Sequence, residues 1–289
     1  ASILRPGNPD LKWEASEQLN IGMDASFFNG KLTANVDYYV KETKDMLISL
    51  PVSFEAGFQS APSINGGSIS NKGLELTMGF REKIGDLNWS ISGNLSSVSN
   101  KVTSLGIGLP ITGSSVSSYI SLPATYTEVG EEVGYFKGYI VDGIYQSDSD
   151  VDLEFQPNAK AGDFKFRDIN NDGVLTDEDK TKIGSPWPNF TYGANIDLEY
   201  KGFDFNLSIT GVSGNDIFNA NKINTYPMKY FGGSGVVNAS KNILNRWTPG
   251  SGRNEIPRLI YNDANGNYGN SSTFYVEDGS FMRIRNITL

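Results

Sequence analysis

The residues of this sequence with the clearest capacity for chemistry form one acidic run, Asp168–Asp179. Oxygen-bearing side chains occupy its first, third and fifth positions, and Gly173 at the sixth allows the sharp turn of an EF-hand-like calcium loop. The twelfth position carries an Asp in place of the usual bidentate Glu, which shortens one ligand and lowers the expected affinity for calcium. The candidate calcium ligands are Asp168, Asn170, Asp172, the backbone carbonyl of Val174, and Asp179.

No amphipathic helices flank this run, so a bound calcium ion would pin an extended loop in place and would not switch it between two states. The same residues also suit an ordinary Asp/Asn/Gly turn that holds no ion, because the match rests only on residue types at a fixed spacing. Both interpretations stay open at the level of sequence.

Two residue types that carry much of enzyme chemistry are missing, since the 289 residues include no histidine and no cysteine. Their absence excludes a Ser-His-Asp triad, the HExxH zinc motif, thiolate nucleophiles and disulfide bonds. Adjacent acids such as Glu131-Glu132 are typical of solvated loops, and no two carboxylates can be nominated as a glycosidase pair. The sequence therefore predicts no catalytic residues and a protein that is not an enzyme.

Charge and hydropathy limit the partners and the location of the chain. A formal net charge of -9 would repel a nucleic-acid backbone, so a nucleic-acid partner is excluded. The longest apolar stretch, Met46–Val52, is far shorter than the roughly 20 residues of a membrane-spanning helix. Ala1–Asn20 also lacks the apolar centre of a signal peptide. We therefore expect no transmembrane helix and a chain that begins after any export signal.

Period-two alternation of apolar and polar residues predicts β-strands joined as hairpins. The alternation runs on both sides of Asn29-Gly30, which is the strongest short hairpin signal. It also flanks turns at Glu82–Asp86 and Lys201-Gly202, and a last alternating segment begins at Phe281. The predicted fold class is all-β and antiparallel, with one apolar and one polar face on each strand.

Short and long connections alternate along the chain. Three tight turns are separated by long excursions at about 49–71, 97–189 and 213–279. Transmembrane β-barrels show this asymmetry, with tight periplasmic turns, long extracellular loops and aromatic girdles near the strand ends. The same parity predicts that the strand-like segment Tyr135–Tyr145 lies within an excursion and does not cross the membrane.

About seven crossings are expected, which is too few to close a barrel with a wide lumen. An open sheet edge in lipid would leave backbone N–H and C=O groups without partners. The sequence therefore predicts part of a larger antiparallel transmembrane β-barrel with long extracellular loops. The polar residues expected to face its lumen are Glu75, Arg81, Asn94, Asp197, Glu199 and Asp204.

The excursions are rich in aromatic residues, most of which we expect to pack within the loops, because long ordered loops need small cores of their own. These aromatic residues are Tyr119, Tyr126, Tyr135, Phe136, Tyr226, Tyr230, Phe231, Tyr261 and Tyr268. A helical spacing after Ser234 predicts a short amphipathic helix that ends before Pro249. Its apolar positions are Val236, Ala239, Ile243 and Trp247.

Several motifs, in order along nearly the whole chain, resemble one known family. Asn8–Glu14 and the hairpin that follows it resemble the start of the C-terminal barrel half of TonB-dependent transporters, and Asn71–Leu76 resembles their recurrent strand entry. More specific segments resemble the SusC/RagA branch of that family. These segments are Gly134–Phe136 with Gly138-Tyr139, Asp142–Gln146, Asp168–Gly184, Asn245–Pro249, Ile256–Leu259 and Ser280–Leu289.

The resemblance implies a barrel of about 22 strands in the outer membrane of a Gram-negative, Bacteroidota-like cell. It also implies an N-terminal plug, energy from the TonB complex through that N-terminal part, and a SusD-like surface lipoprotein as a lid. The imported ligand would be a glycan by default, or a peptide. The plug and the closing strands are absent from residues 1–289, so these residues are interpreted as a partial barrel in outer-membrane lipid.

A soluble calcium-dependent β-sandwich that binds carbohydrate, as an accessory module or adhesin, is the alternative. Period-two strands with one apolar face also occur in sandwiches, so the alternation alone does not distinguish lipid from a soluble core. A glycan-cleaving enzyme with two carboxylates is a third hypothesis, for which no site can be named.

Overall fold

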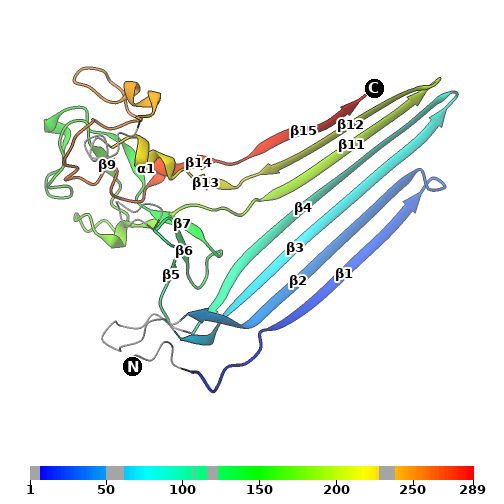
Figure 1. The fold of residues 1–289 in the computed structure, drawn as a ribbon, viewed down its shortest axis with the longest axis horizontal. Coiled ribbons are helices and arrows are strands. Elements are labelled where there is room, and N and C mark those ends of the chain that lie inside the picture. The colour runs from blue at the N-terminus through cyan, green and yellow to red at the C-terminus, as the bar shows by residue number, and fades with distance from the viewer. Residues whose placement is uncertain (1–6, 50–61, 107, 116–122, 228–237) are drawn as a thin grey trace.

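The computed structural model describes residues 7–49, 62–106, 108–115, 123–227 and 238–289. Its main element is a seven-stranded antiparallel sheet with the strand order β1-β2-β3-β4-β11-β12-β15 (Figure 1). These strands are β1 Ala15–Phe27, β2 Leu32–Ser49, β3 Ser63–Ile84, β4 Leu87–Leu105, β11 Phe190–Tyr200, β12 Phe203–Ser213 and β15 Phe281–Thr288. The predicted all-β antiparallel class is confirmed, and the remaining described strands form small sheets of four, two and two strands.

The strand register sorts the side chains onto an apolar and a polar face. Leu76 on β3 lies opposite Val36 of β2 and Leu95 of β4. The next residue, Thr77, lies opposite Asn35 and Asn94. Because successive side chains point to opposite faces, this register gives rows across the sheet that are largely apolar or largely polar. One apolar row contains Leu32, Phe80, Ile91, Ile196, Leu207 and Ile287.

Tight turns join the long strands at one end of the sheet, and the excursions lie at the other end (Figure 1). Asn29 and Gly30 have φ angles of 56° and 81°, and Lys201 and Gly202 have φ angles of 48° and 85°. Paired left-handed residues of this kind match the twist of a hairpin. Between β3 and β4 the turn consists of Gly85-Asp86 alone, which is shorter than predicted because both strands continue up to it.

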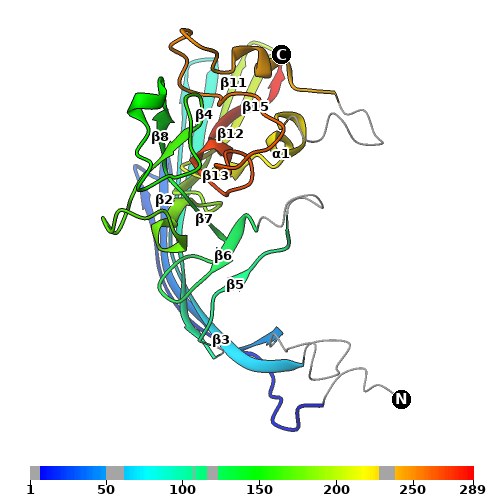
Figure 2. The same ribbon diagram turned by 90° about the vertical axis from the view of Figure 1, so that its left-hand side faces the viewer.

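Three strands extend well past the length of an ordinary membrane crossing. β2, β3 and β4 contain 18, 22 and 19 residues, whereas β11 and β12 contain 11 each. Pairing of β3 and β4 therefore continues into the ranges 49–71 and 97–189, which the sequence assigned to excursions. Figure 2 shows the far end of β3 curving away from the rest of the sheet. Register shifts at Thr43/Met46 and Ser68/Ile69 lie in this part, where extra residues bend a strand.

The two longer excursions fold together into one body, which we call the loop assembly and define as the described residues of 106–189 and 214–280. Tyr139 and Ser272, one from each excursion, form a parallel β-bridge. The elements of the loop assembly are β5 Ile111–Thr112, β6 Thr125–Thr127, β7 Tyr135–Gly138, β8 Val141–Ile144, β9 Phe164–Phe166, β10 Thr181–Gly184, β13 Asp216–Phe218, β14 Val276–Asp278, α1 Asn221–Thr225, and the 3-10 helices η2 Asp148–Asp150, η3 Asp177–Asp179, η5 Lys241–Asn245 and η6 Thr273–Tyr275. The segment Tyr135–Tyr145 thus lies outside the seven-stranded sheet, as the parity of the turns predicts.

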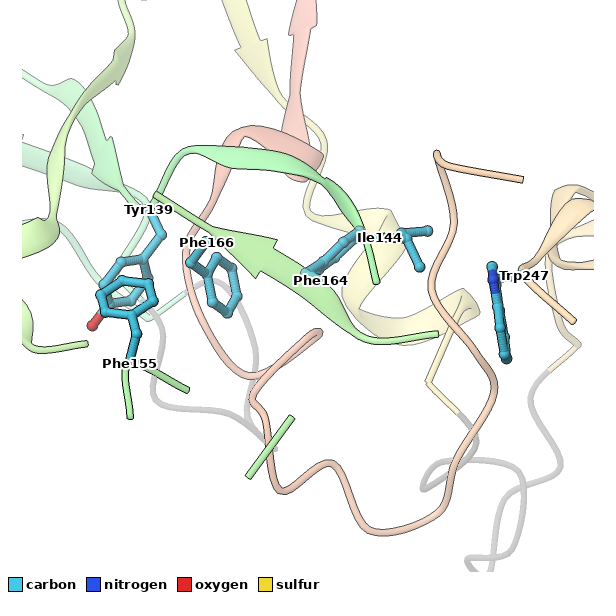
Figure 3. Packing of buried hydrophobic residues seen from close by; sticks show 6 residues of the cluster. All are labelled: Tyr139, Ile144, Phe155, Phe164, Phe166 and Trp247. Atoms are coloured by element: carbon cyan, nitrogen blue, oxygen red, sulfur yellow. The ribbon is translucent and has the colours of Figure 1, made fainter. Parts of the chain in front are cut away.

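The loop assembly has its own hydrophobic core. Its largest cluster contains Tyr139, Ile144, Phe155, Phe164, Phe166 and Trp247 (Figure 3). Phe164 is 1% exposed, and Trp247, which comes from the other excursion, is 7% exposed. Two smaller clusters form around Tyr268 and around Tyr275. Because the largest cluster contains residues of both excursions, tertiary packing holds the excursions together.

Candidate functional site

The polar face of the sheet carries a hydrogen-bonded network near the tight-turn end. Asp197 accepts hydrogen bonds from Ser90 Oγ at 3.2 Å and from Asn206 Nδ2 at 2.6 Å. Glu199 accepts one from Asn88 Nδ2 at 3.1 Å. All five residues are exposed or half-buried and lie on neighbouring strands β4, β11 and β12. This face therefore presents ordered carboxylates and amides, as expected for a water-filled lumen.

A buried polar network joins the two excursions inside the loop assembly. The Asp163 side chain is 1% exposed, and its carboxylate accepts hydrogen bonds from Arg258 Nε at 2.7 Å and Arg258 Nη2 at 2.9 Å. Asn267 Nδ2 donates to the same carboxylate at 2.9 Å. Asn267 Oδ1 in turn accepts the backbone N–H of Phe164 at 2.8 Å. Such buried charges are tolerated because they are paired and hydrogen-bonded.

Sequence reasoning missed this network, because Asp, Gln and Asn are mostly surface residues. Gln156 is 1% exposed, and its amide nitrogen donates to Asn265 Oδ1 at 3.0 Å. Nearby, burial raises the pKa of Asp263, while the backbone N–H groups of Tyr268 and Asn267 oppose that rise. The sequence signal for this network is Ile256–Leu259, which contains Arg258 and is one of the segments that resemble the SusC/RagA branch.

The candidate calcium loop is an ordered turn built from its own polar side chains. Asp168 accepts backbone N–H groups from Asn171 at 2.6 Å and Gly173 at 2.9 Å. Asp172 Oδ1 accepts the N–H of Val174 at 2.8 Å. Gly173 has a φ of +77°, a left-handed conformation that favours glycine and fits the predicted turn. These bonds join positions one, five, six and seven in one turn, through two carboxylates and backbone N–H groups, and the Val174 carbonyl that would bind calcium takes no part in them.

The remaining two candidate ligands are engaged differently. Asn170 Nδ2 donates to Asp172 Oδ2 at 2.8 Å, and Asn170 Oδ1 accepts the N–H of Asp172 at 3.1 Å. Asp179 is 0% exposed, and its two oxygens accept the N–H groups of Ile169 at 2.9 Å and Thr176 at 2.8 Å. Within the described ranges, three or more acidic side chains nowhere gather closely enough to hold a metal ion. Calcium binding stays a prediction.

The end of this loop is attached to the core of the loop assembly through Tyr139. Its hydroxyl donates to Asp177 at 3.4 Å, and Lys180 contacts both the same carboxylate at 2.7 Å and the Tyr139 ring at 5.3 Å. Burial, and then the Asp177 charge, raises the pKa of Tyr139. The hydrogen bond from Lys180 is the main cause that lowers the pKa of Asp177. The loop is therefore fixed at this end.

Most of the aromatic residues of the excursions pack as expected. Tyr126 is half-buried and Tyr135, Phe136, Tyr226 and Tyr268 are buried, whereas Tyr261 is 64% exposed. Tyr119, Tyr230 and Phe231 lie outside the described residues. Burial thus accounts for most of these rings without a ligand.

The prediction of an amphipathic helix is wrong for residues 238–249, the part of this segment that the structure describes. Only the five-residue 3-10 helix η5 forms there, and Ser240 caps it by accepting the N–H of Asn242. Ile243 and Trp247 are both 7% exposed, but they enter different hydrophobic clusters, so no single helical face packs. Ser234 and Val236 lie outside the described residues.

Comparison with known proteins places the chain among outer-membrane receptors. Residues 1–280 match the family "TonB dependent receptor-like, beta-barrel". The TonB-dependent receptor P26 of Formosa agariphila is 33% identical over 290 residues, which cover 100% of this chain and 28% of the relative. The TonB-dependent receptor SusC of Bacteroides thetaiotaomicron is 26% identical over 295 residues, which cover 98% of this chain and 26% of SusC.

A solved structure of the RagAB peptide transporter superimposes with a TM-score of 0.72 at 26% identity, over 98% of this chain and 29% of that chain. This chain thus spans less than a third of the length of these relatives. Among the described residues, every helix is too short or too polar to cross a bilayer. The family match, the SusC relative and the RagA-like fold agree with the sheet described above, and the chain belongs to the TonB dependent receptor-like β-barrel family of the outer membrane, in its SusC/RagA branch.

Proposed function

We propose that these residues are part of the barrel of an outer-membrane importer. A nutrient passes through this barrel with energy supplied by the TonB complex. The observation that carries this proposal is the separation of apolar and polar rows across all seven strands. The apolar side is also uncovered, since Ile21, Met23 and Leu74 are 63%, 64% and 50% exposed. It therefore does not pack on a second sheet as in a sandwich, and it fits a lipid-facing side opposite a polar lumen. The transport step needs no covalent chemistry, since the wall has only to guide the nutrient and hold the loops.

The partners belong to the same proposal. A SusD-like surface lipoprotein would cover the loop assembly, and the TonB complex would act through an N-terminal plug of the parent protein. Support comes from the SusC relative and from the likeness to RagAB. The proposed cargo is a glycan, and a peptide is the second candidate because RagAB is a peptide transporter.

Membrane fractionation of the native protein from its source, followed by detergent extraction and intact mass, tests this function. We expect a detergent-requiring species much heavier than 31.5 kDa, together with a lipoprotein. Mass spectrometry of what co-purifies would show sugars for a glycan importer and short peptides for a peptide importer. A species of 31.5 kDa that stays soluble without detergent would contradict the proposal.

We also propose that the loop Asp168–Asp179 binds calcium as a structural ion. Support comes from the turn at Gly173 and from the oxygens of Asp168 and Asp172, each of which has a further lone pair available. Calorimetry on the folded parent protein should show calcium binding that Asp172→Ala abolishes, because one ligand is lost.

Val174→Ala is the matched control for calcium binding. It keeps the backbone carbonyl that would bind calcium and changes only a side chain that is 53% exposed, so binding should persist. Absence of binding in the parent protein, or equal binding by the Asp172→Ala variant, would show that the loop is an ordinary turn.

A further inference from the structure

A cleft of about 540 Å³ opens in the loop assembly where its three hydrophobic clusters meet. Phe274 lines the cleft and packs against all three clusters. Its ring centroid lies 5.2 Å from that of Phe164 and 5.6 Å from that of Tyr226. Pockets that bind small ligands measure roughly 300–1,000 Å³, so the cleft has a suitable size and an aromatic floor fixed by packing.

Two charged residues that line the cleft, Lys222 and Glu277, are already paired with each other. Lys222 Nζ donates to the carbonyl of Phe274 at 2.6 Å and to Glu277 Oε1 at 2.9 Å, and it lies 4.8 Å from the centre of the Phe274 ring. Glu277 also accepts a hydrogen bond from Asn219 Nδ2 at 3.0 Å. These contacts hold the floor in place and leave the pair without a net charge.

The cleft also offers polar groups that the fold does not use. Asn242, Asn245 and Glu255 line the cleft and are exposed. Across the described residues, their side chains have no hydrogen-bond or ion-pair partner. Two carboxamides and one carboxylate provide both donors and acceptors. This set, placed near an aromatic ring, is available for a ligand.

The chemistry of the cleft fits a neutral sugar better than the other ligand classes. Vicinal hydroxyl groups can donate to a carboxylate and both donate to and accept from a carboxamide, while the C–H groups of a sugar ring can pack on the partly exposed Phe274. An anion would meet the unpaired charge of Glu255. A peptide that binds as an added strand needs a free strand edge, whereas this cleft is lined by side chains from several short segments.

We propose that this cleft is a binding subsite for a neutral oligosaccharide, with Asn242, Asn245 and Glu255 as its polar contacts and Phe274 as its stacking surface. The inference rests on the proposed import function and adds a place on the extracellular side where the cargo is held. Sugar binding here would precede entry into the lumen.

Calorimetry on the detergent-solubilised parent protein tests the subsite, with oligosaccharides prepared from starch, laminarin and xylan as probes. We expect at least one probe to bind, and the double variant Asn245→Ala/Glu255→Ala to weaken that binding by about tenfold or more, since hydrogen bonds to a charged group are lost. The matched control is Asn262→Ala/Glu154→Ala, which removes an exposed amide and an exposed carboxylate of the same loop assembly outside the cleft. The control should bind as tightly as the parent protein.

Two results would overturn the subsite, and uptake of the probes by whole cells shows whether the glycan cargo fails with it. If a probe enters the cells but the double variant binds it as tightly as the parent, the cleft is not the subsite and the importer stands. If no probe binds and none enters the cells, the glycan cargo fails together with the subsite.

Discussion

Replacing Arg258 with alanine is expected to destabilise the loop assembly by about 3 to 5 kcal/mol, because it leaves a buried carboxylate without its charged partner. Asp163 would keep its hydrogen bonds from Asn267 Nδ2 and the backbone N–H of Lys160, both at 2.9 Å, but would lose both contacts with the guanidinium. Hydrogen exchange of the parent protein, read by mass spectrometry over residues 156–166, should report faster opening in the variant.

Arg167→Ala is the matched control for this prediction. Arg167 also pairs with an aspartate, Asp142, but their side chains are 52% and 31% exposed. Surface pairs of this kind contribute little, so exchange should not change measurably. Equal acceleration in the two variants would mean that the buried pair does not hold the excursions together. Protection of both excursions should fall in the Arg258 variant, since the pair joins one excursion to the other.

The hairpins of the sheet could be predicted because the residues that determine them lie close together in the sequence. Alternation fixes which side chains share a face, and residues such as Asn29 and Gly30 adopt the positive φ angles that a tight hairpin turn requires. The candidate calcium turn was predictable for the same reason, since Asp168 and Gly173 lie five residues apart and are joined by one hydrogen bond.

The loop assembly could not be predicted because its stability comes from contacts between distant residues. Gln156 and Asn265 are 109 positions apart, yet their side chains are hydrogen-bonded and buried. Polar residues of this type are ordinarily exposed, so no local pattern marks them. The cleft floored by Phe274 is also invisible in the sequence, because its lining residues come from both excursions. β3 and β4 extend into the predicted excursions 49–71 and 97–189, because their backbones remain paired in residues where the alternation of apolar and polar side chains is weak.

Leu76→Arg on the apolar face is expected to destabilise the folded parent barrel by about 2 to 4 kcal/mol if Leu76 lies near the bilayer midplane, since the charge would enter lipid. Leu76 lies in an apolar row between Val36 and Leu95, eight residue pairs from the end of β3 at Ile84. Urea unfolding of the parent protein in lipid vesicles measures the change.

Thr77→Arg is the control, because Thr77 is the next residue of β3 after Leu76 and its side chain points to the opposite, polar face of the sheet. Thr77 lies between Asn35 and Asn94, where a guanidinium would enter a polar lumen and find water and amide oxygens. Its cost should therefore be small. Similar costs at the two positions would contradict the assignment of the faces, and a larger cost at Thr77 would place the lipid on the opposite side of the sheet. The comparison tests which face meets lipid without depending on the identity of the cargo or the lid.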